Sequence, residues 1–180
     1  VFATVKRAPN ALAAALGDVP GVADVQTTVE HTVRVEIAGI SDPIMGHLIG
    51  VDPRRPQRMN RVALRSGRAL HPEGAVQTVA HSDGTIDALV SEGFAQARGL
   101  APGATLTALI DGKRRTLRIV GIALSPEYIF AGFGGMPDMR GFGVFWIDRD
   151  TLAAAYDMDG AFNHVAIKLA PGASEVAVIA

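Results

Sequence analysis

Apolar and polar positions alternate along much of the chain, which predicts short strands joined by glycine and proline turns. Residues 2–6 indicate a strand, and Pro9 is expected at the first position of an alanine-rich helix that continues over residues 10–16. Between residues 22 and 38 the alternation predicts one long or two shorter half-buried strands. Residues 44–51 indicate a further strand.

The pattern changes at residue 52. Residues 52–72 contain six arginines and three prolines, so we expect a loop-rich crossing there. Beyond it, residues 86–90 indicate a strand, and residues 91–98 indicate a short helix with Ser91 as its N-cap.

The strongest local prediction is a β-hairpin over residues 104–124. Two β-prone runs, residues 104–110 and 113–124, flank Asp111-Gly112. Such a pair favours a tight hairpin turn, because both of its central residues must adopt positive φ.

The C-terminal part predicts a strand over residues 144–147, a helix over residues 149–156 capped by Asp148, and a last strand over residues 163–170. The chain therefore begins and ends with a strand–helix–strand unit. We expect an α+β fold of two lobes. Residues 1–51 plus 143–180 would form a mixed αβ lobe, and residues 52–142 a β-rich lobe inserted into it.

Composition excludes several classes of protein. The 180 residues are 48% apolar and 19% charged, which argues against disorder, and a net charge of −1 argues against nucleic-acid binding through bulk charge. No run approaches the roughly 18 apolar residues of a membrane span. The chain has no cysteine, so disulfides and thiolate metal sites are excluded. Because it begins with Val1, we expect it to be a piece of a longer protein.

Candidate chemistry is sparse. The five histidines lack the spacing that places two metal ligands on one helical face, and only His81-Ser82-Asp83 groups compactly. The glycine-rich run at residues 132–135 is followed by Met136-Pro137 and not by a phosphate-binding helix start. We therefore expect no metal, no cofactor and no enzyme. A hydrolase that uses His81 and Asp83 with a distant nucleophile is the weakest alternative.

The arginines of the crossing form a candidate basic patch for phosphates or anionic headgroups. Its members are Arg54, Arg55, Arg58 and Arg61. The alternative is that these side chains are solvated or paired with acids elsewhere, and no aromatic residue interleaves them for base stacking.

A glycine-punctuated loop at residues 128–136 carries large apolar side chains. Its candidate partner or ligand contacts are Tyr128, Ile129, Phe130, Phe133 and Met136. Such side chains are costly to expose, so either they fold back on the core or they contact a partner, an apolar ligand or a membrane face.

Several stretches resemble a known family, the FtsX-like or MacB-type ABC-transporter permeases. The run at residues 60–68 is similar to that family's Asn-Arg…Gly-Arg stretch, and residues 90–95 with 99–103 are similar to its Val-Ser-Glu, helix, Gly-Leu-x-x-Gly pattern. The most specific run is 120–130, Val-Gly-Ile-Ala-Leu-Ser-Pro-Glu-Tyr-Ile-Phe. Residues 143–146 and 163–165 extend the likeness almost to the end of the chain.

The resemblance implies an extracytoplasmic domain that lies between two transmembrane helices of a permease in the cell, or inner, membrane. Its ATP hydrolysis would belong to a cytoplasmic ATPase subunit, and an envelope adaptor or a substrate would be its partner outside. We expect this domain to relay the motion of the membrane helices to that substrate or partner. The alternative is a domain that binds an apolar or lipidated ligand through the loop at residues 128–136.

Overall fold

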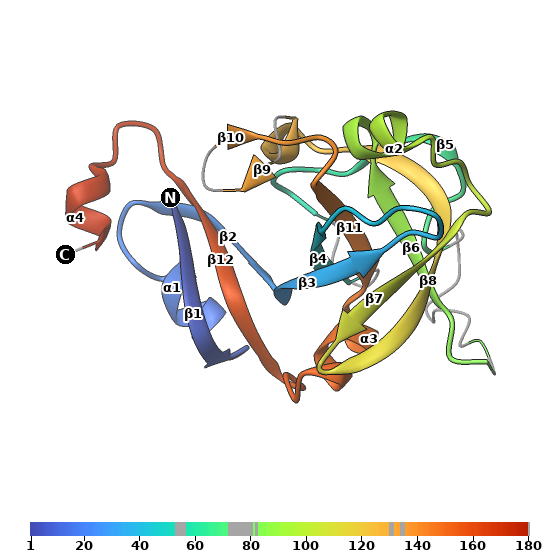
Figure 1. The fold of residues 1–180 in the computed structure, drawn as a ribbon. Coiled ribbons are helices and arrows are strands. Elements are labelled where there is room, and N and C mark those ends of the chain that lie inside the picture. Colours follow the sequence, from blue (N-terminus) through green and yellow to red (C-terminus); the bar gives the residue numbers. More distant parts are fainter. Residues whose placement is uncertain (53–56, 72–80, 82, 130–131, 134–135, 180) are drawn as a thin grey trace.

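The computed structural model describes residues 1–52, 57–71, 81, 83–129, 132–133 and 136–179, and its strands lie mainly in two sheets (Figure 1). The small sheet consists, in order across it, of β1 (Phe2–Pro9), β12 (Ala161–Leu169) and β2 (Val22–Thr28). The large sheet consists of β5 (Ala63–Gly67), β8 (Lys113–Leu124), β6 (Ile86–Ser91), β11 (Phe142–Asp148), β4 (Ile44–Val51), β3 (Glu30–Glu36) and β7 (Thr105–Ile110).

The large sheet closes on itself, because β7 also pairs with β8. Strands β4 and β11 run parallel at its centre, whereas β11 and β6 are antiparallel. Closure gives β3, β4, β6, β7, β8 and β11 a neighbour on each side and leaves β5 as an added outer strand. We call this unit the closed sheet.

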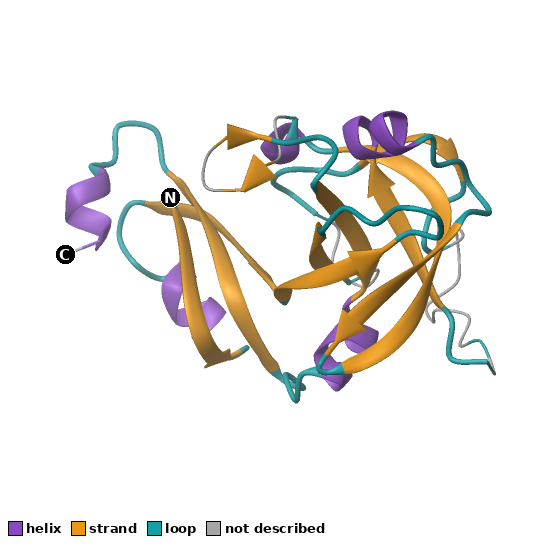
Figure 2. Cartoon of the chain, in the orientation of Figure 1, coloured by secondary structure: helices purple, strands orange, loops and turns teal. Residues whose placement is uncertain are grey.

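Short helices cover the two sheets (Figure 2). Helix α1 (Leu12–Gly17) packs on the small sheet, and α4 (Glu175–Ile179) follows β12. Helices α2 (Glu92–Arg98) and α3 (Arg149–Ala155) pack on the closed sheet. Between them in the chain lie the 3₁₀ turn η1 (Pro126–Tyr128) and the ribbon of β9 (Gly132–Phe133) with β10 (Met136–Pro137). No helix among the described residues is long and apolar enough to cross a membrane.

The main core fills the interior of the closed sheet. Phe145 of β11 and Phe94 of α2 meet edge to face with ring centroids 5.6 Å apart, and Leu152 of α3 joins the same cluster. A second cluster covers the outer side of β11 around Trp146, where Tyr128 packs against the indole. Alternate residues of β11 thus supply both clusters, as expected for a strand buried on its two faces.

Most of the predicted elements are present. The hairpin β7–β8 is confirmed, with φ of 46° at Asp111 and 71° at Gly112, and β4 spans the predicted residues. Asp148 is the predicted N-cap of α3, since its carboxylate accepts the Thr151 N–H at 2.8 Å.

Three local predictions are wrong. Pro9 ends strand β1, and the helix begins only at Leu12. Ser91 stands at the N-cap position of α2 but makes no side-chain cap, because its hydroxyl accepts the N–H of Val144 on the neighbouring strand β11. The predicted loop-rich crossing contains strand β5, whose exposed residues lack apolar alternation.

The predicted division into lobes is not confirmed by the sheets. The unit β1–α1–β2 lies in the small sheet, but β11 and β12 of the last unit belong to different sheets. Strands β3, β4 and β11, assigned to the lobe of the chain ends, pair with each other and with strands of the middle. Lobe boundaries at residues 51 and 142 stay a prediction.

Candidate functional site at the junction of the two sheets

The chain passes directly from the small sheet into the closed sheet between β2 and β3. Val29, fully buried, is the connecting residue, and its carbonyl accepts the N–H of Gly50 on β4 at 2.9 Å. A Cβ at Gly50 would lie 3.1 Å from the Cα of Arg149 and 3.3 Å from the Val29 oxygen. Glycine at this position therefore allows β4, α3 and the crossing to approach closely.

The carboxylate of Glu30 lies at this crossing between two imidazoles. Its Oε2 is 2.9 Å from Nε2 of His47 on β4, and its Oε1 is 3.1 Å from Nδ1 of His164 on β12. Thr28 donates its hydroxyl to the same Oε1 at 2.5 Å. The Glu30 side chain is only 10% exposed, so its charge depends on these partners.

The pKa values in this cluster shift in opposite directions. Burial alone would raise the pKa of Glu30, but hydrogen bonds and positive charge from His164 and His47 outweigh it and lower the pKa to about 2. Burial alone would lower the pKa of His164, but its hydrogen bond to Glu30 and the charges of Glu30 and Glu127 raise it. Each shift favours the ion pair over the neutral groups.

Asn163 attaches the backbone of Glu30 to β12. Its Oδ1 accepts the Glu30 N–H at 2.8 Å, and its Nδ2 donates to the Glu30 carbonyl at 2.7 Å. The amide side chain thus bonds the first residue of β3 as a neighbouring strand would. Glu30 is therefore tied to the small sheet through both its backbone and its side chain.

Arg149 makes a second connection between the sheets. It begins α3, which packs on the closed sheet, and its guanidinium donates to Thr27 O at 3.0 Å, Ala161 O at 2.9 Å and Asn10 Oδ1 at 3.2 Å. These acceptors lie on β2, at the start of β12 and just after β1, so one buried side chain contacts all three regions of the small sheet.

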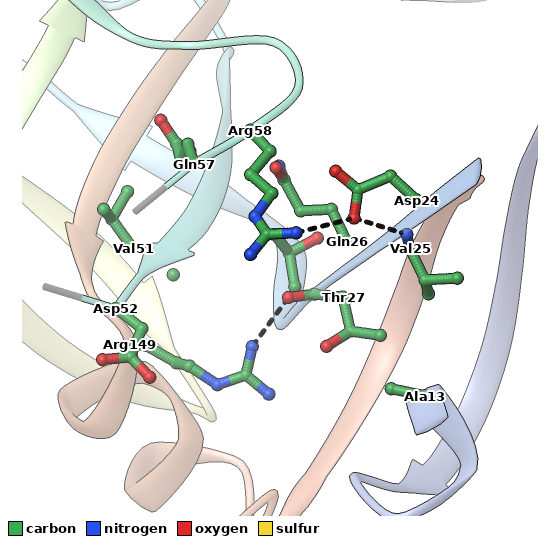
Figure 3. Close-up of a pocket in the computed structure, with 12 residues that line it drawn as sticks. Ala13, Asp24, Val25, Gln26, Thr27, Val51, Asp52, Gln57, Arg58 and Arg149 are labelled. Atoms are coloured by element: carbon green, nitrogen blue, oxygen red, sulfur yellow. Dashed lines mark hydrogen bonds and ion pairs between the residues drawn. The ribbon is translucent and has the colours of Figure 1, made fainter. Parts of the chain in front are cut away.

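A cavity of about 400 Å³ opens beside Arg149 between β2 and the end of β4 (Figure 3). Polar side chains form part of its wall: Asp24, Gln26 and Thr27 come from β2, and Arg58 contacts Asp24 across the opening at 3.9 Å. A smaller cavity of about 20 Å³, the size of one water molecule, lies among Glu30, Glu127 and His164.

Comparisons with known proteins identify the family. The family model of the MacB-like periplasmic core domain matches residues 3–180. The chain belongs to the MacB-like periplasmic core domain family. No curated protein matches the sequence.

Solved structures share the fold of this MacB-like domain. The extracellular domain of the noncanonic ABC-type transporter YknZ from Gram-positive bacteria is 11% identical with a TM-score of 0.52, and the match covers 93% of this chain and 81% of that one. The periplasmic region of MacB from Actinobacillus actinomycetemcomitans is 13% identical with a TM-score of 0.51, over 93% and 67%. A domain assigned to a permease protein from Porphyromonas gingivalis is 17% identical with a TM-score of 0.52, over 98% and 78%.

The family fixes the general role of the domain. MacB-like periplasmic domains belong to ABC-transporter permeases, which are anchored in a membrane and work with a cytoplasmic ATPase. The domain lies on the extracytoplasmic side, and the family is one of transporter domains.

The predicted loop contacts of this MacB-like domain separate into buried and exposed positions. Tyr128 is half-buried against Trp146, and burial raises the pKa of its hydroxyl. Ile129 is 44% exposed and Met136 is 74% exposed. Phe133 pairs through its backbone in the β9–β10 ribbon, and Phe130 lies outside the described residues. A contact role for these five residues stays a prediction.

The predicted basic patch is only partly described. Arg58 lines the cavity and pairs with Asp24, and Arg61 is exposed, whereas Arg54 and Arg55 lie outside the described residues. The patch stays a prediction.

His81 and Asp83 do not bond to each other. His81 Nε2 lies 3.1 Å from the buried Asp87, while Asp83 accepts the N–H of Thr85. Asp87 also binds Arg68 and Arg118, and these contacts lower its pKa against the opposing effect of burial. Across the part of the chain that the structure describes, no group of three or more histidines and acids could hold a metal ion.

The Glu30 cluster is not predicted from the sequence. Its members are far apart in sequence: Glu30 and Asn163 are separated by 133 positions. The one local indication was the polar pair Glu30-His31, which interrupts the alternation between β2 and β3.

Proposed function

We propose that this domain relays ATP-driven motion of the permease's membrane helices to a substrate or an envelope partner outside the membrane. The small sheet receives the motion, and the closed sheet presents the surface that responds. The Glu30 cluster and Arg149 transmit force between them.

The observation that carries this proposal is the position of the two described ends. The amino group of Val1 donates to Ile167 O at 2.9 Å, so the chain starts on β12. Helix α4 lies beside the start of β2, where a Cβ at Gly21 would be 3.1 Å from Val178. Both ends thus lie at the small sheet, away from the closed sheet (Figure 1). Membrane helices joined to these ends would move the small sheet first.

Spin-label distances in the full-length permease, assembled with its ATPase, test the relay. Labels at Lys6→Cys on β1 and Lys113→Cys on β8 report the distance between the sheets, and both native side chains are exposed. The domain itself has no cysteine to interfere. We expect the distance distribution to shift between the nucleotide-free and the ATP-bound transporter, because the states differ in the contacts they make.

A matched pair within the closed sheet controls for local effects. Labels at Ser66→Cys on β5 and Lys113→Cys should keep one distance in both states, since both strands pair in the same sheet. An unchanged Lys6–Lys113 distance across the nucleotide cycle would overturn the relay.

A second candidate function is binding of an apolar or lipidated ligand at the loop of residues 128–136. Ile129 and Met136 support it, because their exposed side chains supply apolar surface that such a ligand could contact. We expect a dansylated fatty acid to bind the chain and to bind less tightly when Ile129→Gln and Met136→Gln are combined. Equal binding to the unaltered chain and the double variant would contradict this role.

A further inference from the structure

The two sheets differ in how their edges are protected. Among the described strands, each strand of the closed sheet other than β5 has a neighbour on both sides, although β3 and β7 pair only over residues 35–36 and 107–108. In the small sheet, β12 lies between β1 and β2, so each of these outer strands has one edge that pairs with no described strand. An open edge presents backbone N–H and C=O groups that another strand can bond.

The ladder determines which groups of β2 point outward. Ile167 on β12 exchanges both of its backbone bonds with Val1, at 2.9 and 2.8 Å, so its backbone groups face β1 and not β2. Val25 lies opposite Ile167, and Thr27 lies opposite Val165, two positions along β12. Because the bonding direction alternates along an antiparallel pair, the backbone groups of Val25 and Thr27 point away from β12.

Side chains already bond half of these outward groups. The Val25 N–H donates to Oδ1 of Asp24 at 2.9 Å, and the Thr27 carbonyl accepts from Arg149 at 3.0 Å (Figure 3). The Thr27 N–H and the Val25 C=O remain, and neither has a partner among the described residues.

These two groups match one residue of a parallel strand. In a parallel ladder, a residue donates its N–H to the carbonyl of one neighbour and accepts from the N–H of the residue two positions further along. Val25 C=O and Thr27 N–H have this spacing. An antiparallel neighbour would bond the N–H and the C=O of one and the same residue. In Val25 the N–H is already bonded, and in Thr27 the C=O is already bonded, so neither residue offers both groups.

The residues of this edge line the cavity. Five consecutive residues, 24–28, line the cavity of about 400 Å³, and Gln57 and Arg58 form part of the opposite wall. Ligand sites in proteins have volumes of about 300 to 1,000 Å³. The outward Val25 C=O and Thr27 N–H favour a peptide over a lipid chain, because a peptide backbone can bond both groups and a lipid chain cannot.

We propose that an extended peptide segment from another polypeptide binds in this cavity and adds to β2 as a parallel strand. The peptide residue between Val25 and Thr27 donates to the former and accepts from the latter. The side chains of the bound peptide lie toward Gln57 and Arg58. This inference deepens the proposed function, since a strand held here contacts both sheets, but binding to the isolated chain is measured without the transporter and can succeed or fail independently of the relay.

A phage-displayed library of linear peptides, selected on the chain of residues 1–180, supplies the probe. We expect enrichment of binding peptides, and the affinity of a selected peptide is then measured against three variants. Thr27→Pro removes the outward N–H without breaking a bond to β12, and proline is tolerated at such edge positions. Thr27→Val keeps the N–H and nearly the same shape.

The third variant is the matched control on the opposite edge. Thr4 lies opposite His164, whose backbone faces β2, so the Thr4 N–H points outward from β1. Thr4→Pro makes the same kind of change on the other outer strand. We expect Thr27→Pro to weaken peptide binding about five-fold or more, as loss of one hydrogen bond implies. Thr27→Val and Thr4→Pro should bind as the unaltered chain does.

Hydrogen exchange gives a reading that needs no variant. The Thr27 amide should exchange rapidly in the free chain, although it lies within a strand, and should become protected when the peptide is bound. The proposal is overturned if no peptide is enriched, if Thr27→Pro and Thr4→Pro weaken binding equally, or if the Thr27 amide stays unprotected in the complex. Self-association of the chain through β2 without peptide binding would also overturn it.

Discussion

At the scale of single residues, Glu30 connects parts of the molecule that are otherwise distant. One imidazole beside it comes from β4 of the closed sheet, and the other comes from β12 of the small sheet. Both histidines are largely buried, with side chains 19% and 15% exposed. Removing the shared anion would take the nearest ionic partner from two poorly solvated imidazoles, which costs more than loss of an exposed ion pair.

Glu30→Gln should therefore lower the free energy of unfolding by about 1.5 to 3 kcal/mol, the usual effect of losing hydrogen bonds to a charged group. Urea unfolding followed by the fluorescence of the single tryptophan, Trp146, measures it. Glu36→Gln on the same strand is the control, since Glu36 pairs with Arg114 at the surface and the change should cost less than about 1 kcal/mol. Equal effects of the two substitutions would show that the Glu30 cluster adds no stability.

The same cluster should make stability depend on pH in both directions. The raised pKa of His164 contributes stability that is fully present below the ordinary value of 6.5 and is lost as pH rises through the raised value. The lowered pKa of Glu30 contributes stability that is present above its ordinary value of 4.5 and is lost as pH falls toward 2. The urea concentration at the midpoint of unfolding should therefore fall as pH rises through the raised pKa of His164. His164→Gln should make this decline less steep. An unchanged alkaline decline in the variant would exclude His164 as its source.

At the scale of elements, the hairpin β7–β8 depends on a turn that glycine suits. Gly112 has φ of 71°, and a Cβ there would meet no atom within 4 Å. The cost of a side chain is therefore set by the backbone conformation alone and not by a clash.

Gly112→Ala should destabilise the domain by about 1 to 2 kcal/mol, the cost of a left-handed conformation for an ordinary residue. Gly17→Ala, at the end of α1, is the matched control, because its Cβ also meets open space but its φ is not positive. That change should stabilise by about 0.4 to 1 kcal/mol. Urea midpoints of the two variants should move in opposite directions, and a shared direction would contradict the backbone explanation.

Elements that depend on neighbouring residues could be predicted from the sequence, whereas those that depend on distant contacts could not. The Asp111-Gly112 turn and the Asp148 cap act over a few positions, and both are confirmed. The sequence predicts that Ser91 caps its helix, but its hydroxyl accepts a hydrogen bond from Val144, on a strand distant in sequence. The Glu30 cluster leaves almost no local pattern in the sequence, because the residues that bond Glu30 meet only after both sheets have formed.

At the scale of the whole molecule, Arg149 joins the two sheets through three hydrogen bonds to the small-sheet side. Two of its acceptors are backbone carbonyls, which would lose their partner if the guanidinium were removed. Local opening of the small sheet should then become easier while the closed sheet keeps its own core.

Arg149→Met should accelerate amide hydrogen exchange in β2 and β12 and leave exchange in β6 and β8 unchanged. Mass spectrometry of the exchanged peptides measures both regions in one experiment. Arg34→Met is the control, because Arg34 is exposed and pairs only loosely with Glu36 at 3.7 Å. Faster exchange throughout the domain would mean that the two sheets open as one unit. It would contradict the expectation that loss of Arg149 eases opening of the small sheet alone.

The central place of β12 in the small sheet has a consequence for biosynthesis. Strands β1 and β2 leave the ribosome first, but each pairs with β12 and not with the other, so the first sheet to be synthesised is the last that can be completed. The parallel pair β4–β11 imposes a similar delay on the closed sheet. Such pairing over long sequence distances slows folding and leaves unpaired strands exposed on the nascent chain. The early strands of this domain must therefore avoid aggregation until nearly the whole of it has been translated.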